Sequence, residues 1–122
     1  MKFSDSHEWI HVEEGTSAIV GITEHAQKEL GDIVYVELPE VGKKVKLGQE
    51  VVVLESTKAA ADVYSPVSGT ITEVNQNLKT SPDKVNHSPE KEGWLFKINL
   101  DQPEQLDLLM DRQAYEKMIL RK

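Results

Sequence analysis

Short runs of β-branched and aromatic residues, separated by glycine and proline, constrain the fold of this chain more than any other feature. Several runs place apolar residues at every second position, which is the period of a half-buried strand. Many short strands between turn residues are typical of a barrel or a sandwich, so we predict a mostly β fold. The predicted strands are Ser17–Ile22, Ile33–Leu38, Glu50–Leu54, Val67–Val74 and Trp94–Leu100.

Helix signals lie at the margins of this strand pattern. Thr23 can cap a short internal helix over Glu24–Leu30 that Gly31 ends. Pro103 fits the first turn of a C-terminal helix, and Asp111 can cap a second one. The apolar stripes of these two helices would be Leu106, Leu109 and Met110, then Tyr115, Met118 and Ile119, with Arg121 and Lys122 at the negative end of the second helix dipole.

Length and charge limit the classes of function. A chain of 122 residues fits one domain, and the absence of cysteine excludes disulfides, thiolate metal sites and a catalytic thiol. The net charge of −7 argues against nucleic acid or an anionic membrane as a partner and favours docking onto basic surfaces. No apolar run approaches the ~20 residues of a membrane helix. The start, MKFSDSHEWI, lacks a secretory or transit pattern, so we expect a cytoplasmic location.

One lysine, Lys58, stands among small and mostly uncharged neighbours in LESTKAAADVYSP, residues 54–66. A strand ends before it and another begins after it, so we expect Lys58 at or near the tip of a hairpin, outside the core. A lysine amine is normally a charged point on a flexible stem. Acylation would remove the charge and lengthen the stem, which suits a tethered group that swings between sites. From the pattern alone, an ordinary solvated turn lysine remains an open alternative.

The segment ESTKAAADVYSPVSG resembles the lipoyl-attachment segment of the glycine cleavage system H proteins. A lone Thr-Lys-Ala triplet is a weak signal, because many lipoyl domains carry similar triplets, but further segments resemble H proteins along essentially the whole chain. The resemblance implies a barrel-sandwich hybrid fold of the lipoyl/biotinyl type, with residues 1–122 as a single lipoyl-carrier domain. The matching segments are 55–69, SHEWI (6–10), 21–42, 65–75 and EGWLFKI (92–98).

The same resemblance implies a role in glycine catabolism. Lys58 would carry lipoate in amide linkage, placed there by a lipoate-attaching enzyme. A pyridoxal-phosphate-dependent glycine decarboxylase would transfer an aminomethyl group to the arm. An aminomethyltransferase would pass the methylene to tetrahydrofolate, and a dihydrolipoyl dehydrogenase would reoxidise the dithiol. The protein itself, expected to be a monomer, would be a carrier and not an enzyme.

The resemblance also implies that the loaded arm folds back onto Ser6, Glu8 and Asp62. The arm ends in a primary amine that is cationic near neutral pH, so the two acids could pair with it and Ser6 could accept a hydrogen bond. From the residues alone, the more ordinary interpretation is that Ser6 is a cap or turn residue and both acids are solvated charges. Some family members have histidine where this chain has Glu29, so we assign that position no function.

The sequence His7-Glu8-Trp9-Ile10-His11 matches the HExxH zinc-protease signature. That chemistry needs both histidines on one helix face, whereas this segment is β-branched and aromatic and predicts a strand. On a strand the two histidines lie about 13 Å apart, too far for one ion. His25 and His87 have no ligand-like spacing and are interpreted as surface residues, so we predict no metal site.

Two classes of function therefore stay open beside the H-protein carrier. One is a lipoyl carrier for acyl transfer, either within a 2-oxo acid dehydrogenase or as a relay that donates lipoyl or octanoyl groups to such complexes. The dehydrogenase module is disfavoured because such modules usually lie in longer chains. A biotin carrier is disfavoured because methionine usually flanks the biotinylated lysine, where this chain has Thr57 and Ala59. The other class is the zinc hydrolase.

Overall fold

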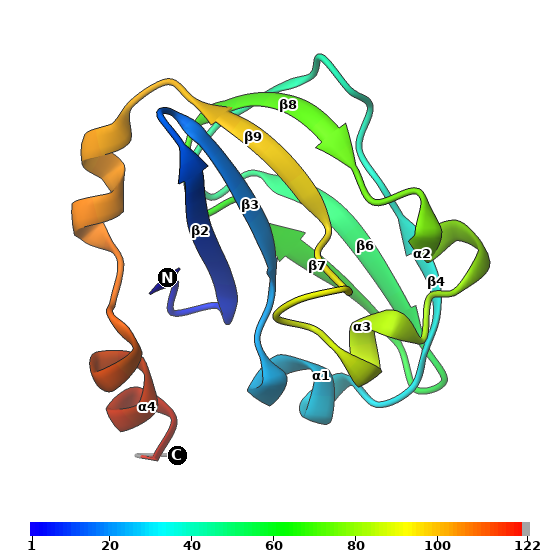
Figure 1. The fold of residues 1–122 in the computed structure, drawn as a ribbon. Coiled ribbons are helices and arrows are strands. Elements are labelled where there is room, and N and C mark those ends of the chain that lie inside the picture. The colour runs from blue at the N-terminus through cyan, green and yellow to red at the C-terminus, as the bar shows by residue number, and fades with distance from the viewer. Residues whose placement is uncertain (121–122) are drawn as a thin grey trace.

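The computed structural model describes residues 1–120, and two antiparallel β-sheets make up most of it (Figure 1). The sheets lie face to face and stay separate over the described residues, which confirms the mostly β prediction. The larger sheet has the order β1 (Lys2–Phe3), β2 (Glu8–Glu14), β3 (Ser17–Ile22), β9 (Phe96–Leu100), β8 (Gly69–Val74) and β5 (Lys44–Val45). The smaller sheet has the order β4 (Ile33–Glu37), β6 (Glu50–Ser56) and β7 (Ala60–Tyr64).

One apolar core fills the space between the sheets. In β6, Val52 and Leu54 are buried, while Val51 and Val53 are only partly covered. Successive residues of the strand therefore point alternately into the core and toward the surface. Burial of each such side chain contributes about 1.5–3 kcal/mol. Because a slip of one residue would expose this set, burial fixes the register of β6 against its neighbours. Every predicted strand segment occurs, with its ends shifted by at most two residues.

The internal helix α1 (Glu24–Leu30) has the two ends that the sequence predicted. The hydroxyl of Thr23 accepts a hydrogen bond from the backbone N–H of Ala26 at 3.2 Å. The N–H of Gly31 donates to the carbonyl of Gln27 at 3.1 Å, with a φ of 83° at the glycine. That conformation is essentially restricted to glycine, which explains why the helix ends there.

The C-terminal region differs in part from the prediction. Residues Pro103–Leu108 form a 3-10 helix, η1, and not an α-helix. The chain cannot continue helically, because Met110 exchanges two backbone hydrogen bonds of 2.8 Å with Phe3 in an isolated bridge. The second predicted helix is α4 (Arg112–Leu120), where the carboxylate of Asp111 accepts the N–H of Ala114 at 2.8 Å. The predicted contribution of residues 121 and 122 lies outside the described residues.

An aromatic cluster of Phe3, Trp9 and Tyr115 joins the two ends of the chain. The rings of Phe3 and Tyr115 stack with centroids 4.8 Å apart. Met118 and Ile119 pack against the same cluster, so the apolar face predicted for α4 is confirmed. This packing holds α4 against the N-terminal segment, as Figure 1 shows.

Two one-turn helices, α2 (Asn77–Thr80) and α3 (Lys84–His87), connect β8 to β9. The sequence analysis, which placed the helices at the margins of the strand pattern, did not predict these two. Each buries one apolar residue, Leu78 or Val85, and a single residue cannot create a detectable period. Among residues 1–120, no helix is long and apolar enough to span a membrane.

A close approach between Gly21 and Trp9 provides a test of the packing. The two residues face each other across β2 and β3, and a Cβ atom at Gly21 would lie 2.7 Å from the indole ring. Gly21→Ala should therefore lower the free energy of unfolding by about 1–3 kcal/mol, measured by urea denaturation. The same change should be less destabilising in a Trp9→Leu background, because the ring is absent. An equal effect in both backgrounds would show that the ring is not the cause.

Candidate functional site

Lys58 lies at the tip of the hairpin formed by β6 and β7, with its side chain exposed, as the sequence predicted. Ser56 shapes the turn. Its hydroxyl oxygen accepts the N–H groups of Lys58 and Ala59, both at 3.1 Å, and donates to the carbonyl of Ala59 at 3.0 Å. These bonds satisfy the turn backbone locally, so the lysine side chain is not needed to hold the turn.

The hairpin tip is tied to the end of α1. The N–H of Thr57 donates to the carbonyl of Asp32 at 3.0 Å. The stem of Lys58 lies across Gly31, because a Cβ atom built there would be 3.4 Å from Cε of the lysine. No ion pair within residues 1–120 involves Lys58. The amine is therefore held near α1 on a defined stem and is accessible to a modifying enzyme.

A pocket of about 240 Å³, which we call the α1 pocket, opens beside this stem. Leu30, the residue before Gly31, forms part of its wall. The pocket brings together all three residues that the family resemblance assigned to arm docking, Ser6, Glu8 and Asp62. The remaining lining residues are His7, Ile22, Ala26, Glu29, Ala61 and Val63, so apolar walls alternate with polar groups.

Glu8 is buried, with only 2% of its surface exposed, so its interpretation as a solvated charge is wrong. Its Oε1 accepts hydrogen bonds from the hydroxyls of Ser4 and Ser6, both at 2.6 Å, and its Oε2 accepts the N–H of Tyr64 at 3.4 Å. Burial raises the pKa of the Glu8 carboxyl, and these three hydrogen bonds oppose the rise. The sequence pattern did not reveal this, because the burial of Glu8 also involves distant segments, such as the one that brings the N–H of Tyr64 to its carboxylate.

Neither Glu8 nor Asp62 takes part in an ion pair within the part of the chain that the structure describes. Asp62 is exposed, as expected, whereas Glu8 is not. A buried carboxylate is unfavourable when no cation compensates it. The α1 pocket therefore places two acidic side chains, neither of which forms an ion pair within residues 1–120, next to apolar walls. Such a pocket suits a guest with an aliphatic stem and a cationic end.

Comparison with known proteins supports the resemblance seen in the sequence. The sequence profile of the family described as "Glycine cleavage H-protein" matches residues 1–122. The chain belongs to the glycine cleavage H-protein family. The family consists of lipoyl-bearing carrier subunits of the glycine cleavage system, which act with the other enzymes of that system.

Individual members of the H-protein family resemble the chain over nearly its full length. The glycine cleavage system H protein of Thermotoga maritima is 54% identical over 115 residues, covering 94% of this chain and 92% of that protein. That of Deinococcus radiodurans is 58% identical over 115 residues, covering 94% and 90%. The crystal structure of the H protein from Mycobacterium marinum aligns with a TM-score of 0.88 at 34% identity, covering 97% of this chain and 94% of that one.

The HExxH match has no helical geometry, as the sequence predicted. β2 begins at Glu8, and the exposed His11 lies on this strand opposite Ile19. His7 precedes the strand in a turn with a φ of 72°. Within this H-protein-family fold, the two histidines therefore do not converge on one ion.

The structure instead brings together three residues that the sequence analysis left separate. His25 was interpreted as a surface residue, but its Nε2 is buried and lies 2.5 Å from Oε1 of Glu29. The ring centroids of His7 and His25 are 4.8 Å apart. The four-residue spacing of His25 and Glu29 on a correctly predicted helix was a signal that could have found this pair.

The buried carboxyl predicts a pH dependence of stability. The Glu8 carboxyl has an ordinary pKa of 4.5, and its pKa in the folded protein is higher. At a pH between the two values, Glu8 is therefore protonated in the folded protein and ionised in the unfolded chain. As pH rises from the ordinary value through the raised one, ionisation of Glu8 therefore reduces the free energy of unfolding. Glu8→Gln has no proton to lose, so its stability relative to the unaltered protein should increase from about pH 4 to about pH 7. Urea denaturation across this range measures the difference.

Ser4→Ala provides the complementary variant for this measurement. Loss of the Ser4 hydroxyl removes a hydrogen bond that lowers the Glu8 pKa. The window in which stability falls should therefore extend to higher pH in Ser4→Ala. A difference between Glu8→Gln and the unaltered protein that does not change with pH would contradict the assignment.

Proposed function

We propose that this protein is the lipoyl carrier of a glycine cleavage system and that lipoate is joined in amide linkage to Lys58. The observation that carries the proposal is an exposed lysine amine on the β6–β7 hairpin tip of a chain that belongs to the H-protein family over its whole length. The neighbours Thr57, Ala59 and Ala60 are small and exposed, so an attaching enzyme can reach the amine. We propose that residues 1–122 act as one carrier domain.

The amide forms between Nζ of Lys58 and the carboxyl of lipoate, with loss of water. The bound group would supply a disulfide whose S–S bond can open, so that one sulfur bonds to the aminomethyl carbon left when glycine loses carbon dioxide and the other sulfur becomes a thiol. The chain itself supplies the tether point, the turn that presents it and the pocket beside it. No catalytic residue is assigned to the chain.

We assign the α1 pocket as the place where the loaded arm docks. The Lys58 stem already lies across Gly31, directly after Leu30 of the pocket wall. A larger hollow of about 400 Å³ also touches Ser6 and Glu8, but it does not include Asp62. In the α1 pocket, Glu8 and Asp62 pair with the cationic amine and Ser6 accepts a hydrogen bond from it.

The expected strength of docking fits a shuttle. About four methylenes of the arm, at ~0.8 kcal/mol each, contribute ~3 kcal/mol of burial. Ordering the arm opposes this by about 0.5–1.5 kcal/mol. The apolar contribution is then small enough for a partner enzyme to withdraw the arm. The two carboxylates hold the amine while the carrier is not bound to a partner enzyme.

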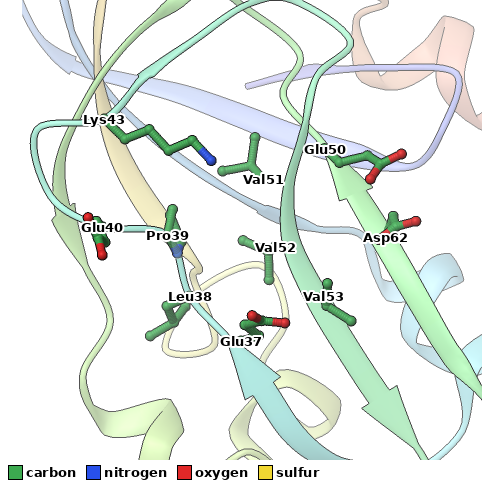
Figure 2. A pocket seen from close by; sticks show the side chains of 10 residues that line it. All are labelled: Glu37, Leu38, Pro39, Glu40, Lys43, Glu50, Val51, Val52, Val53 and Asp62. Atoms are coloured by element: carbon green, nitrogen blue, oxygen red, sulfur yellow. The ribbon is translucent and has the colours of Figure 1, made fainter.

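The proposed partners are a pyridoxal-phosphate-dependent glycine decarboxylase, a tetrahydrofolate-dependent aminomethyltransferase, a dihydrolipoyl dehydrogenase and a lipoate-attaching enzyme. The net charge of −7 favours docking onto basic surfaces of these proteins. Figure 2 shows an acidic groove on the β4–β6–β7 sheet, where Glu37, Glu40, Glu50 and Asp62 accompany a single cation, Lys43. We propose that the protein acts as a monomer in the cytoplasm.

Intact mass tests the attachment. Protein from lipoate-supplied cells should be heavier than its sequence by about 188 Da, the mass of lipoate less water. The addition should vanish in Lys58→Arg, which keeps the charge but cannot form the amide, and should persist in the control variant Lys43→Arg. An addition of about 226 Da would indicate biotin instead. An unmodified protein that supports full glycine turnover would contradict the proposal.

The lifetime of the loaded arm tests the docking site. Glu8→Ala combined with Asp62→Ala should shorten the lifetime of the aminomethyl-loaded protein by about tenfold or more, because two charge-assisted contacts are lost. Glu37→Ala combined with Glu50→Ala removes the same charge from the acidic groove on the β4–β6–β7 sheet and should leave the lifetime unchanged. An unchanged lifetime in the first pair, with the fold intact by circular dichroism, would remove the docking role. A relay function needs only the Lys58 amine, so it predicts the same lifetime of the loaded arm in the two double variants.

A further inference from the structure

We propose that His7, His25 and Glu29 form a binding site for a divalent transition-metal ion, with Zn²⁺ as the best match. One ligand atom from each residue lies within 4.8 Å of the other two. Two imidazoles and one carboxylate are a donor set that zinc commonly uses, whereas Ca²⁺ and Mg²⁺ prefer oxygen alone. The site does not include Lys58, and of the HExxH match it uses only the first histidine, His7.

The fold brings these residues together from two elements. His25 and Glu29 are four residues apart on α1 and so share one face of the helix. His7 comes from the turn before β2, where it has a positive φ of 72°, and its ring lies beside that of His25 on α1. The backbone N–H of Thr23 donates to the carbonyl of His7 at 3.1 Å and holds the turn in place.

A hydrogen-bond chain orients the ring of His7. Its Nδ1 lies 2.7 Å from the hydroxyl of Tyr115, which lies 2.7 Å from the hydroxyl of Thr23. If Nδ1–H donates to Tyr115, the tautomer presents Nε2 as the ligand atom. Metal-binding histidines usually donate their second ring N–H to an oxygen in this way. The first ligand therefore has the support that a metal site requires.

The contact between His25 and Glu29 is not a directed hydrogen bond, and its two atoms lie closer together than two ligands of one ion would. Nε2 of His25 is buried and 2.5 Å from Oε1 of Glu29, yet it makes no properly directed hydrogen bond within residues 1–120. In a tetrahedral site, two ligand atoms point at the ion and not at each other. At Zn–ligand distances of about 2.0–2.1 Å they lie about 3.3 Å apart.

Small side-chain rotations would complete the site. The largest separation must shorten from 4.8 Å and the shortest must lengthen from 2.5 Å, both toward about 3.3 Å. The side chain of Glu29 is 60% exposed and that of His25 is 28% exposed, so both have room to move. The exposure also leaves a fourth coordination position open to water, as in three-ligand zinc sites.

The test is a Zn²⁺ titration of the full-length Lys58→Arg protein. This variant carries no lipoyl sulfur, and the chain has no cysteine, so no thiol can bind the metal. Calorimetry should show one ion per chain. His25→Gln and Glu29→Gln should each weaken binding by at least about tenfold, since loss of even a supporting contact typically has this effect. Glu29→His keeps a ligand and should retain binding.

The matched control is His87→Gln. His87 and Asp83 form the same four-residue histidine–carboxylate pair, with an N–O distance of 3.4 Å, but they belong to no three-residue cluster among the described residues. This control should bind zinc like the parent. Failure of the parent to bind, or equal weakening in His87→Gln and His25→Gln, would overturn the proposal.

Spectra locate the ion without altering His7, whose replacement could disturb the turn. Zinc should shift the ring resonances of His7 and His25 in the NMR spectrum and leave those of His11 and His87 in place. Co²⁺ in the same site should give the visible absorption of a tetrahedral complex. Shifts at His11 or His87 alone would contradict the assignment. Because Lys58→Arg is used throughout, this result is independent of the lipoyl-carrier proposal.

Discussion

Burial of alternate residues of β6 is the constraint on which the rest of the structure depends. Val52 and Leu54 point into the core between the sheets, and this fixes how β6 pairs with β7. Once that register is set, Glu55 and Ala60 become the last pair of the two strands, and Lys58 has no position except the turn that follows. An apolar interaction inside the molecule thus decides where the most exposed functional group lies.

The turn before β2 serves both proposals. It carries Ser4 and Ser6, whose hydroxyls donate to the Glu8 carboxylate at the α1 pocket, and it places the ring of His7 beside that of His25 on α1. A metal ion held by His7, His25 and Glu29 would lie at the wall of the same pocket, because His7 and Glu29 also line it. A dication there would repel the cationic amine of a loaded arm, so the two guests would compete.

Local signals explain which parts of the fold could be predicted. α1 was correct at both ends because Thr23 and Gly31 act within one turn of the residues that they cap. η1 was predicted as an α-helix because the pairing of Met110 with Phe3, which stops it, joins residues far apart in the sequence. The one-turn helices α2 and α3 were missed because neither contains enough residues to show a period.

The sequence by itself determined the longer strands, the cap residues of α1, the family and the exposed position of Lys58, because each depends on short-range patterns or on similarity along the chain. Only the tertiary structure decided that Glu8 is buried, that Ser6 and Asp62 share its pocket, and that His7 meets His25. These residues belong to segments that approach each other through sheet pairing and packing of α1. The electrostatics of a carboxyl or an imidazole depends on such neighbours, and no local pattern encodes them.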